Sequence, residues 1–122
     1  MIRYATNNGN FSNAAIWDGG ASIPTSGDYV YANSYTVTLD VDVNIGSGTL
    51  STEICPTTGI GGGSFPFTTS RTIVADIKAG TSTALISTTA GITLTIIGNY
   101  YGGSSSSAIA ISARAITINV TV

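Results

Sequence analysis

The sequence predicts an all-β protein and, within that class, a short β-solenoid resembling a parallel β-helix. Residues 35–45 alternate between apolar and polar with a period of two, which is typical of a strand with one buried face. Short segments rich in β-branched residues follow residue 70. A weak repeat with an offset of 24 residues matches the length of a solenoid coil. The alternative all-β architecture is a β-sandwich or jelly roll, and we expect little or no helix.

The composition indicates one domain over residues 1–122 with a polar but weakly charged surface. Hydrophobic residues make up 43% of the chain and charged residues only 8%. Four scattered basic residues, against six acidic ones, form no basic stripe that could neutralise phosphates or dock on an anionic membrane. We therefore expect neither nucleic acid nor a membrane as partner. The start Met1–Tyr4 lacks the apolar block of a signal peptide, so we expect a chain that is not exported.

Residues 1–34 are predicted to form a turn-rich, irregular antiparallel segment that caps the solenoid. Asp18-Gly-Gly20 and Ser26-Gly-Asp28 are turn sequences, and Tyr29–Tyr31 is a short strand. Residues 35–54 are predicted as the first long strand. The apolar residues at its odd positions should point inward, and the polar residues at its even positions outward: Tyr35, Val37, Leu39, Val41, Val43 and Ile45 against Thr36, Thr38, Asp40, Asp42 and Asn44.

Residues 55–70 contain several glycines and two prolines, which predicts a long loop rather than a strand. Cys55 is the only cysteine, and the chain has no histidine to activate it, so we interpret it as a small half-buried residue in the loop, before Pro56.

Residues 71–122 are predicted to form short strands around the weak repeat, in which Ile92–Ile97 returns as Ile116–Thr121. The expected strands are Thr72–Ile77, Thr83–Ser87, Ile92–Ile97, Ala108–Ile111 and Ile116–Val122.

The order of these motifs resembles a known kind of module. Trp17-Asp-Gly-Gly, Ile23–Asp28, Tyr29–Tyr31 and Tyr35–Asp40 together are similar to the N-terminal module of β-solenoid proteins in phage head fibres and capsid decoration proteins, which also occurs in bacterial surface adhesins. Gly91–Gly103 looks like the glycine-punctuated coil that follows it. The resemblance implies a structural role and carries no catalytic signature.

Several residue groups could suggest chemistry, and each has a simpler structural interpretation. Asp40 and Asp42 could serve a glycosidase or, with Asp28, a calcium site, but the same pattern is typical of a solvated strand face. Gly59–Ser64 lacks the Lys-Ser/Thr of a phosphate-binding loop. Ser104–Ser107 has no histidine to activate a nucleophile. We therefore predict no catalytic, cofactor-binding or metal-binding residues, and no enzyme activity.

Aromatic residues give two further hypotheses. Five tyrosines and Trp17 could form a platform for sugar rings, or they could pack against one another across strands. The tyrosines are Tyr29, Tyr31, Tyr35, Tyr100 and Tyr101. Two phenylalanines of the glycine-rich loop could anchor a neighbouring subunit or fold back onto the chain's own core. The candidate partner-docking residues are Trp17, Phe65, Phe67, Ile116, Ile118 and Val120.

The strands of the last third predict assembly. Ile92–Ile97 and Ile116–Val122 carry no charge, and uncharged open edges are templates for pairing with another chain. We therefore expect a phage capsid decoration or head-fibre subunit. It would assemble in the host cytoplasm as a homotrimer and bind the capsid surface through the major capsid protein or another virion protein. The alternative is a carbohydrate-binding adhesin module.

Overall fold

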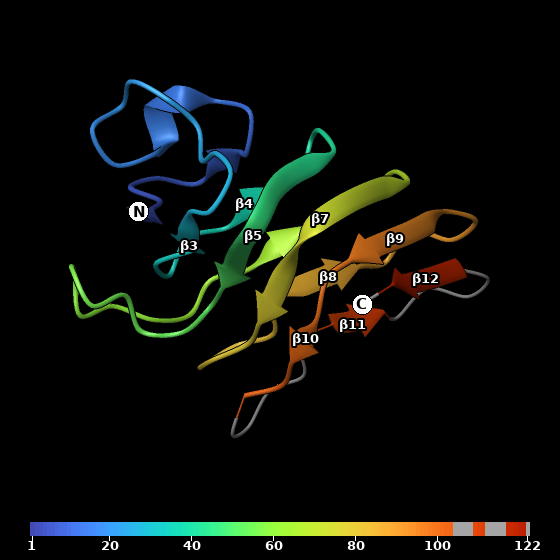
Figure 1. Ribbon diagram of the computed structural model, residues 1–122. Coiled ribbons are helices and arrows are strands. Elements are labelled where there is room, and N and C mark those ends of the chain that lie inside the picture. The colour runs from blue at the N-terminus through green and yellow to red at the C-terminus, as the bar shows by residue number, and fades with distance from the viewer. Residues whose placement is uncertain (104–108, 112–116, 122) are drawn as a thin grey trace.

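A computed structural model describes residues 1–103, 109–111 and 117–121 (Figure 1). Apart from the short 3₁₀ helix η1 (Ala14–Ile16), the regular elements in these ranges are strands. The prediction of an all-β protein is confirmed. The strands are β1 (Ile2–Tyr4), β2 (Gly9–Asn10), β3 (Tyr29–Tyr31), β4 (Val37–Thr38), β5 (Val43–Ser51), β6 (Phe65–Pro66), β7 (Arg71–Lys78), β8 (Leu85–Ser87), β9 (Thr93–Ile97), β10 (Tyr100–Tyr101), β11 (Ile109–Ile111) and β12 (Thr117–Thr121).

The strands wind into a β-solenoid with two main faces. The first face is a sheet of order β1-β3-β5-β7-β9-β12, with β10 also paired to β7, and the second consists of the pair β2-β4 and the three strands β6-β8-β11. A parallel bridge between Thr36 and Ser64 joins the two parts of the second face. All the strand pairs are parallel, as expected for coils that stack in one direction. The solenoid prediction is confirmed, and the alternative of a β-sandwich or jelly roll is not.

The 24-residue repeat corresponds to one coil of the solenoid. Thr117 lies beside Thr93 in the first face, and Ile109 lies beside Leu85 in the second, both at an offset of 24 residues. The repeat in the sequence therefore arises because equivalent positions of successive coils face the same interior.

The segment from residue 35 to 54 turns a corner instead of forming one long strand. Within residues 35–45 the odd residues are buried or half-buried and the polar residues at even positions are more exposed, as predicted. However, β4 and β5 belong to different faces, and residues 39–42 connect them. The alternation continues through the corner because both faces enclose one core. Burial alone therefore could not reveal the break.

Most of the glycine-rich segment 55–70, predicted as a loop, consists of turns and irregular structure, but Phe65–Pro66 adds the strand β6 to the second face. Phe65 and Phe67 donate their backbone N–H groups to Ala84 O and Ile86 O of the next coil. Pro66 lies between these two donors, so its missing N–H leaves both bonds to β8 intact. Phe65 and Phe67 are 0% and 1% exposed. They fill the core between the two faces.

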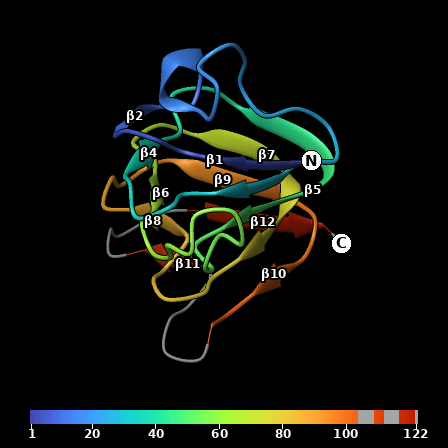
Figure 2. The same ribbon diagram turned by 90° about the vertical axis from the view of Figure 1, so that its left-hand side faces the viewer.

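The cap is confined to residues 11–28, and the strands on either side of it already belong to the solenoid. Trp17 packs edge-to-face on Phe11, with ring centroids 5.3 Å apart, and its indole N–H donates to Phe11 O at 3.0 Å. The segment covers the free edge of β1 through an antiparallel bridge between Ala5 and Trp17. The cap lies at one end of the molecule and β11 and β12 at the other (Figures 1 and 2).

Several glycines occur where one coil touches the preceding coil too closely for a side chain. A Cβ atom on Gly80 would lie 2.3 Å from Glu53 Cα, and one on Gly98 would lie 2.1 Å from Ala75 O. Both contacts are with backbone, which cannot move aside without separating the coils. Gly98 also separates β9 from β10, which pair with successive parts of β7.

Candidate functional site

The candidate site lies where the strands of the first face end. Tyr31, Ser51, Lys78 and Tyr101 follow one another across β3, β5, β7 and β10 as register partners. Because the pairing is parallel, the segments that leave these strands emerge side by side. Glu53 follows the end of β5 and joins this row.

Glu53 is held in place by two hydroxyl groups, one from Ser51 in this row and one from Tyr29 on β3. Its Oε1 accepts hydrogen bonds from Ser51 Oγ, at 2.9 Å, and from Tyr29 Oη. The Tyr29 ring stacks on Tyr31, with centroids 5.0 Å apart. Burial, together with the hydrogen bond to Glu53 and its negative charge, raises the pKa of Tyr29 well above its ordinary value. Tyr29 therefore stays protonated and donates to Glu53 over the whole physiological range.

Lys78 lies beside Glu53 without forming an ion pair with it in the described structure. Its Nζ atom lies 5.6 Å from the centroid of the Tyr101 ring, a cation–π contact. Tyr101 is 46% exposed and Tyr100 53%. The row therefore combines an anchored carboxylate, an ammonium group and exposed aromatic surface.

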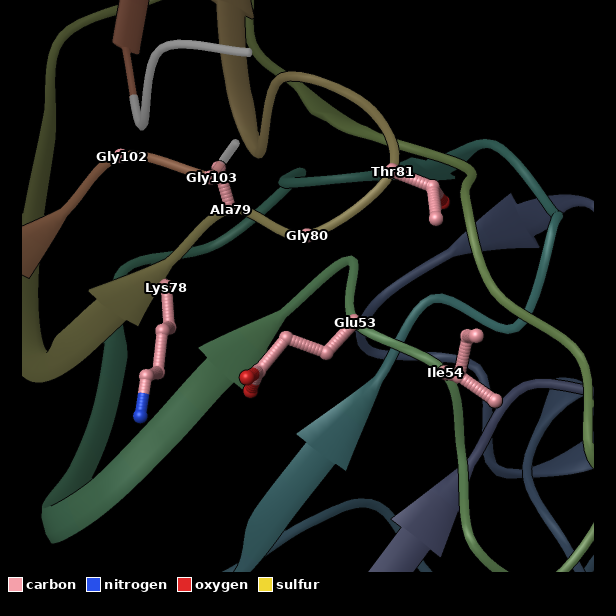
Figure 3. Close-up of a pocket in the computed structure, with 8 residues that line it drawn as sticks. All are labelled: Glu53, Ile54, Lys78, Ala79, Gly80, Thr81, Gly102 and Gly103. Atoms are coloured by element: carbon pink, nitrogen blue, oxygen red, sulfur yellow. The ribbon is translucent and has the colours of Figure 1, made fainter. Parts of the chain in front are cut away.

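A cleft of about 480 Å³ opens next to these groups (Figure 3). The charged ends of Lys78 and Glu53 extend toward the same side, and Ile54 and Thr81 lie across from Lys78. The lining consists of Glu53, Ile54, Lys78, Ala79, Gly80, Thr81, Gly102 and Gly103. Such a cleft offers one fixed acceptor, one donor and a small apolar wall.

The acidic residues considered from the sequence have structural roles. Asp40 accepts hydrogen bonds from the backbone N–H and hydroxyl of Ser12, and Asp42 accepts from Thr72 N at 3.0 Å. Asp28 accepts from Thr25 N at 2.8 Å. Asp40 and Asp42 thus tie the corner after β4 to neighbouring segments, and Asp28 closes its own turn. Among the described residues, no three His, Cys, Asp or Glu side chains gather as a metal site.

The predicted docking residues divide into three groups. Trp17, Phe65 and Phe67 are at most 1% exposed in the core, so their assignment as docking residues is wrong. They are buried because the cap and β6 are integral to the fold. Ile116 and Ser104–Ser107 lie outside the described residues. Ile118 and Val120 belong to β12, in register with Leu94 and Ile96, and their role in docking stays a prediction.

The tyrosines do not form one platform. Tyr29 and Tyr31 stack together, Tyr100 and Tyr101 are exposed on β10, and Tyr35 is half-buried in the corner before β4. Trp17 lies in the cap. Sequence reasoning did not identify Glu53 as a site residue. Its only signal is a position just beyond the strand 43–51, which can be aligned with Lys78 only when the coil register is known.

Comparison with protein-family models, curated proteins and solved structures finds no match to the chain. Within the described ranges, no helix has the length and apolar character needed to cross a membrane.

Proposed function

We propose that this chain is a non-enzymatic structural module that assembles through the β12 end of its solenoid, as a capsid decoration or head-fibre subunit of a phage particle. The observation that carries the proposal is the difference between the two ends of the first face. At one end, the cap satisfies the outer edge of β1. At the other, no described residue pairs with the outer edge of β12.

The covered edge of β1 is closed by specific hydrogen bonds. Tyr4 N donates to Asp18 Oδ1 at 3.1 Å, and Tyr4 O accepts from Asp18 N at 2.9 Å. Thr6 N donates to Ile16 O at 2.6 Å. These bonds occupy groups that another strand would need. The cap therefore opposes head-to-tail pairing of copies in solution.

The opposite end has the features of an edge that pairs. The strands β9, β11 and β12 carry no charged residue, whereas soluble proteins commonly protect open edges with lysine. Their backbones are already extended and parallel to the rest of the face. A strand from another subunit, or from the surface of a particle, can therefore continue the sheet, and solenoids generally require such a cap at each end.

Self-assembly is tested by sedimentation velocity over a concentration series up to about 100 µM, a range that detects weak association. Asn119→Lys places a charge at an exposed position of β12 and should weaken association about tenfold. Ala15→Lys adds the same charge at an exposed position of the cap and should change nothing. A strictly monomeric wild-type chain, or equal effects of both variants, contradicts assembly through β12.

The proposed presence of this chain in a phage particle is tested separately, by mass spectrometry of phage particles purified from the source of the chain. Peptides of this chain should accompany those of the major capsid protein. Phage particles that contain the capsid protein but not this chain would contradict the virion role. The sedimentation result does not depend on this outcome.

A further inference from the structure

We propose that the cleft between Glu53, Lys78 and Thr81 binds a short, uncharged oligosaccharide. This site is separate from the β12 edge through which the chain is proposed to assemble, and the two can succeed or fail independently. The inference rests on the cleft's size, the opposite charges of Glu53 and Lys78 in its lining and the apolar surfaces beside it.

The cleft has the dimensions of a small-ligand site. Its volume of about 480 Å³ falls within the roughly 300–1,000 Å³ of such sites. The backbones of Gly80, Gly102 and Gly103 form part of the lining, so peptide groups are exposed there without side chains over them. This leaves room for a flat ring against the wall of the solenoid.

The polar groups favour a neutral ligand rich in hydroxyl groups. Glu53 is fixed through Oε1 by Tyr29 and Ser51, and its Oε2 accepts no hydrogen bond from the described residues. That oxygen is an acceptor already held in position for a ligand, and Lys78 supplies donors from the neighbouring strand. A sugar hydroxyl can donate to the first and accept from the second. A polyanion would meet the Glu53 carboxylate, and a cation would meet Lys78.

Apolar surface lies beside these polar groups, as recognition of a sugar requires. Ile54 is 58% exposed in the cleft wall, and Tyr101 is 46% exposed beside Lys78. A pyranose ring presents hydroxyls at its rim and C–H groups on its faces, so it can pack on an exposed ring or isoleucine while its rim bonds to charged groups. Lys78 is already held over Tyr101, so both are positioned before binding.

The experiment is a titration of the ¹⁵N-labelled chain with neutral trisaccharides (maltotriose, cellotriose and N-acetylchitotriose), with sialyllactose as the anionic comparison. At least one neutral sugar should bind with a Kd of about 1 mM or tighter and shift the amide signals of Gly80, Gly102 and Gly103. Glu53→Gln and Tyr101→Ala should each weaken that binding about tenfold.

Matched variants elsewhere separate a specific site from a general effect. Asp42→Asn neutralises another exposed carboxylate, and Tyr35→Phe alters another tyrosine; both should bind like the wild type. Thr81→Val removes a hydroxyl from the lining and serves as a further test should Glu53→Gln alter the fold. The proposal is overturned by absence of binding to every neutral sugar at 10 mM, roughly ten times the expected Kd. It is also overturned by tighter binding of sialyllactose, or by binding that the cleft variants leave unchanged.

Discussion

Replacing Asp18 by alanine should remove the side-chain hydrogen bonds that hold the cap against β1, and so destabilise the whole solenoid. Asp18 Oδ1 accepts from Arg3 Nε at 2.8 Å and from Tyr4 N at 3.1 Å. The Arg3 side chain is only 6% exposed, so the variant leaves a buried guanidinium without its carboxylate. Breaking a buried pair in this way costs about 3–5 kcal/mol.

Two features of the site lower that figure. The Asp18 side chain is 22% exposed, and Arg3 keeps its hydrogen bonds to Ser22 O at 2.7 Å and to Ile23 O at 3.3 Å. We therefore expect Asp18→Ala to reduce the free energy of unfolding by about 2–3 kcal/mol, measured by urea denaturation.

Asp42→Ala is the matched control. Asp42 pairs with Arg71 at 3.9 Å, but its side chain is 64% exposed, and exposed pairs contribute about 0–1 kcal/mol. A loss below 1 kcal/mol for Asp18→Ala, or an equal loss in both variants, refutes the reasoning from burial. Because the same change uncovers the edge of β1, Asp18→Ala should also associate more strongly in sedimentation, and Asp42→Ala should not.

Three further predictions concern other parts of the chain. Gly80→Ala places a Cβ 2.3 Å from Glu53 Cα, so it should lower the free energy of unfolding by about 1–3 kcal/mol, measured by urea denaturation. Burial opposes ionisation of Asp40, but its hydrogen bonds with Ser12 prevail and lower its pKa. The stabilisation from Asp40 is therefore present above its unfolded pKa of about 3.9 and lost as the pH falls through its folded pKa. In Ser12→Ala, NMR titration should find this pKa raised. Cys55 is 0% exposed, so a thiol reagent should label it at the rate of unfolding, and fast labelling of the native chain would contradict this.

The sequence predicted the class of fold because burial repeats along the chain. Alternation at 35–45 and the recurrence of Ile92–Ile97 both follow from side chains that face one interior across stacked coils. It was harder to predict which residues of a coil form strands and which form corners. The corner at 39–42 has the same alternation as the strands around it, so only the pairing of β4 and β5 with different faces reveals it.

The candidate site could not be predicted because it depends on register. Glu53 and Lys78 are 25 residues apart in sequence, and the shift in pairing between Asn44 and Thr49 determines which residues of β5 and β7 become neighbours. The role of Phe65 and Phe67 was missed for a different reason. Glycine and proline around them are typical of loops, but here the glycines allow close contact between coils and Pro66 lies where its missing N–H is tolerated.

The length of the coils changes along the molecule in a way that bears on assembly. Toward the cap, equivalent residues are 27 positions apart between β1 and β3 and 20 between β3 and β5. Toward the other end they are 23 apart between β7 and β9 and 24 between β9 and β12. Regular coils leave a straight, even edge, whereas insertions and bulges disrupt pairing with a new strand. The end with unequal coil lengths is the one that the cap covers, and the end with nearly equal coil lengths is the one through which we propose that the chain assembles.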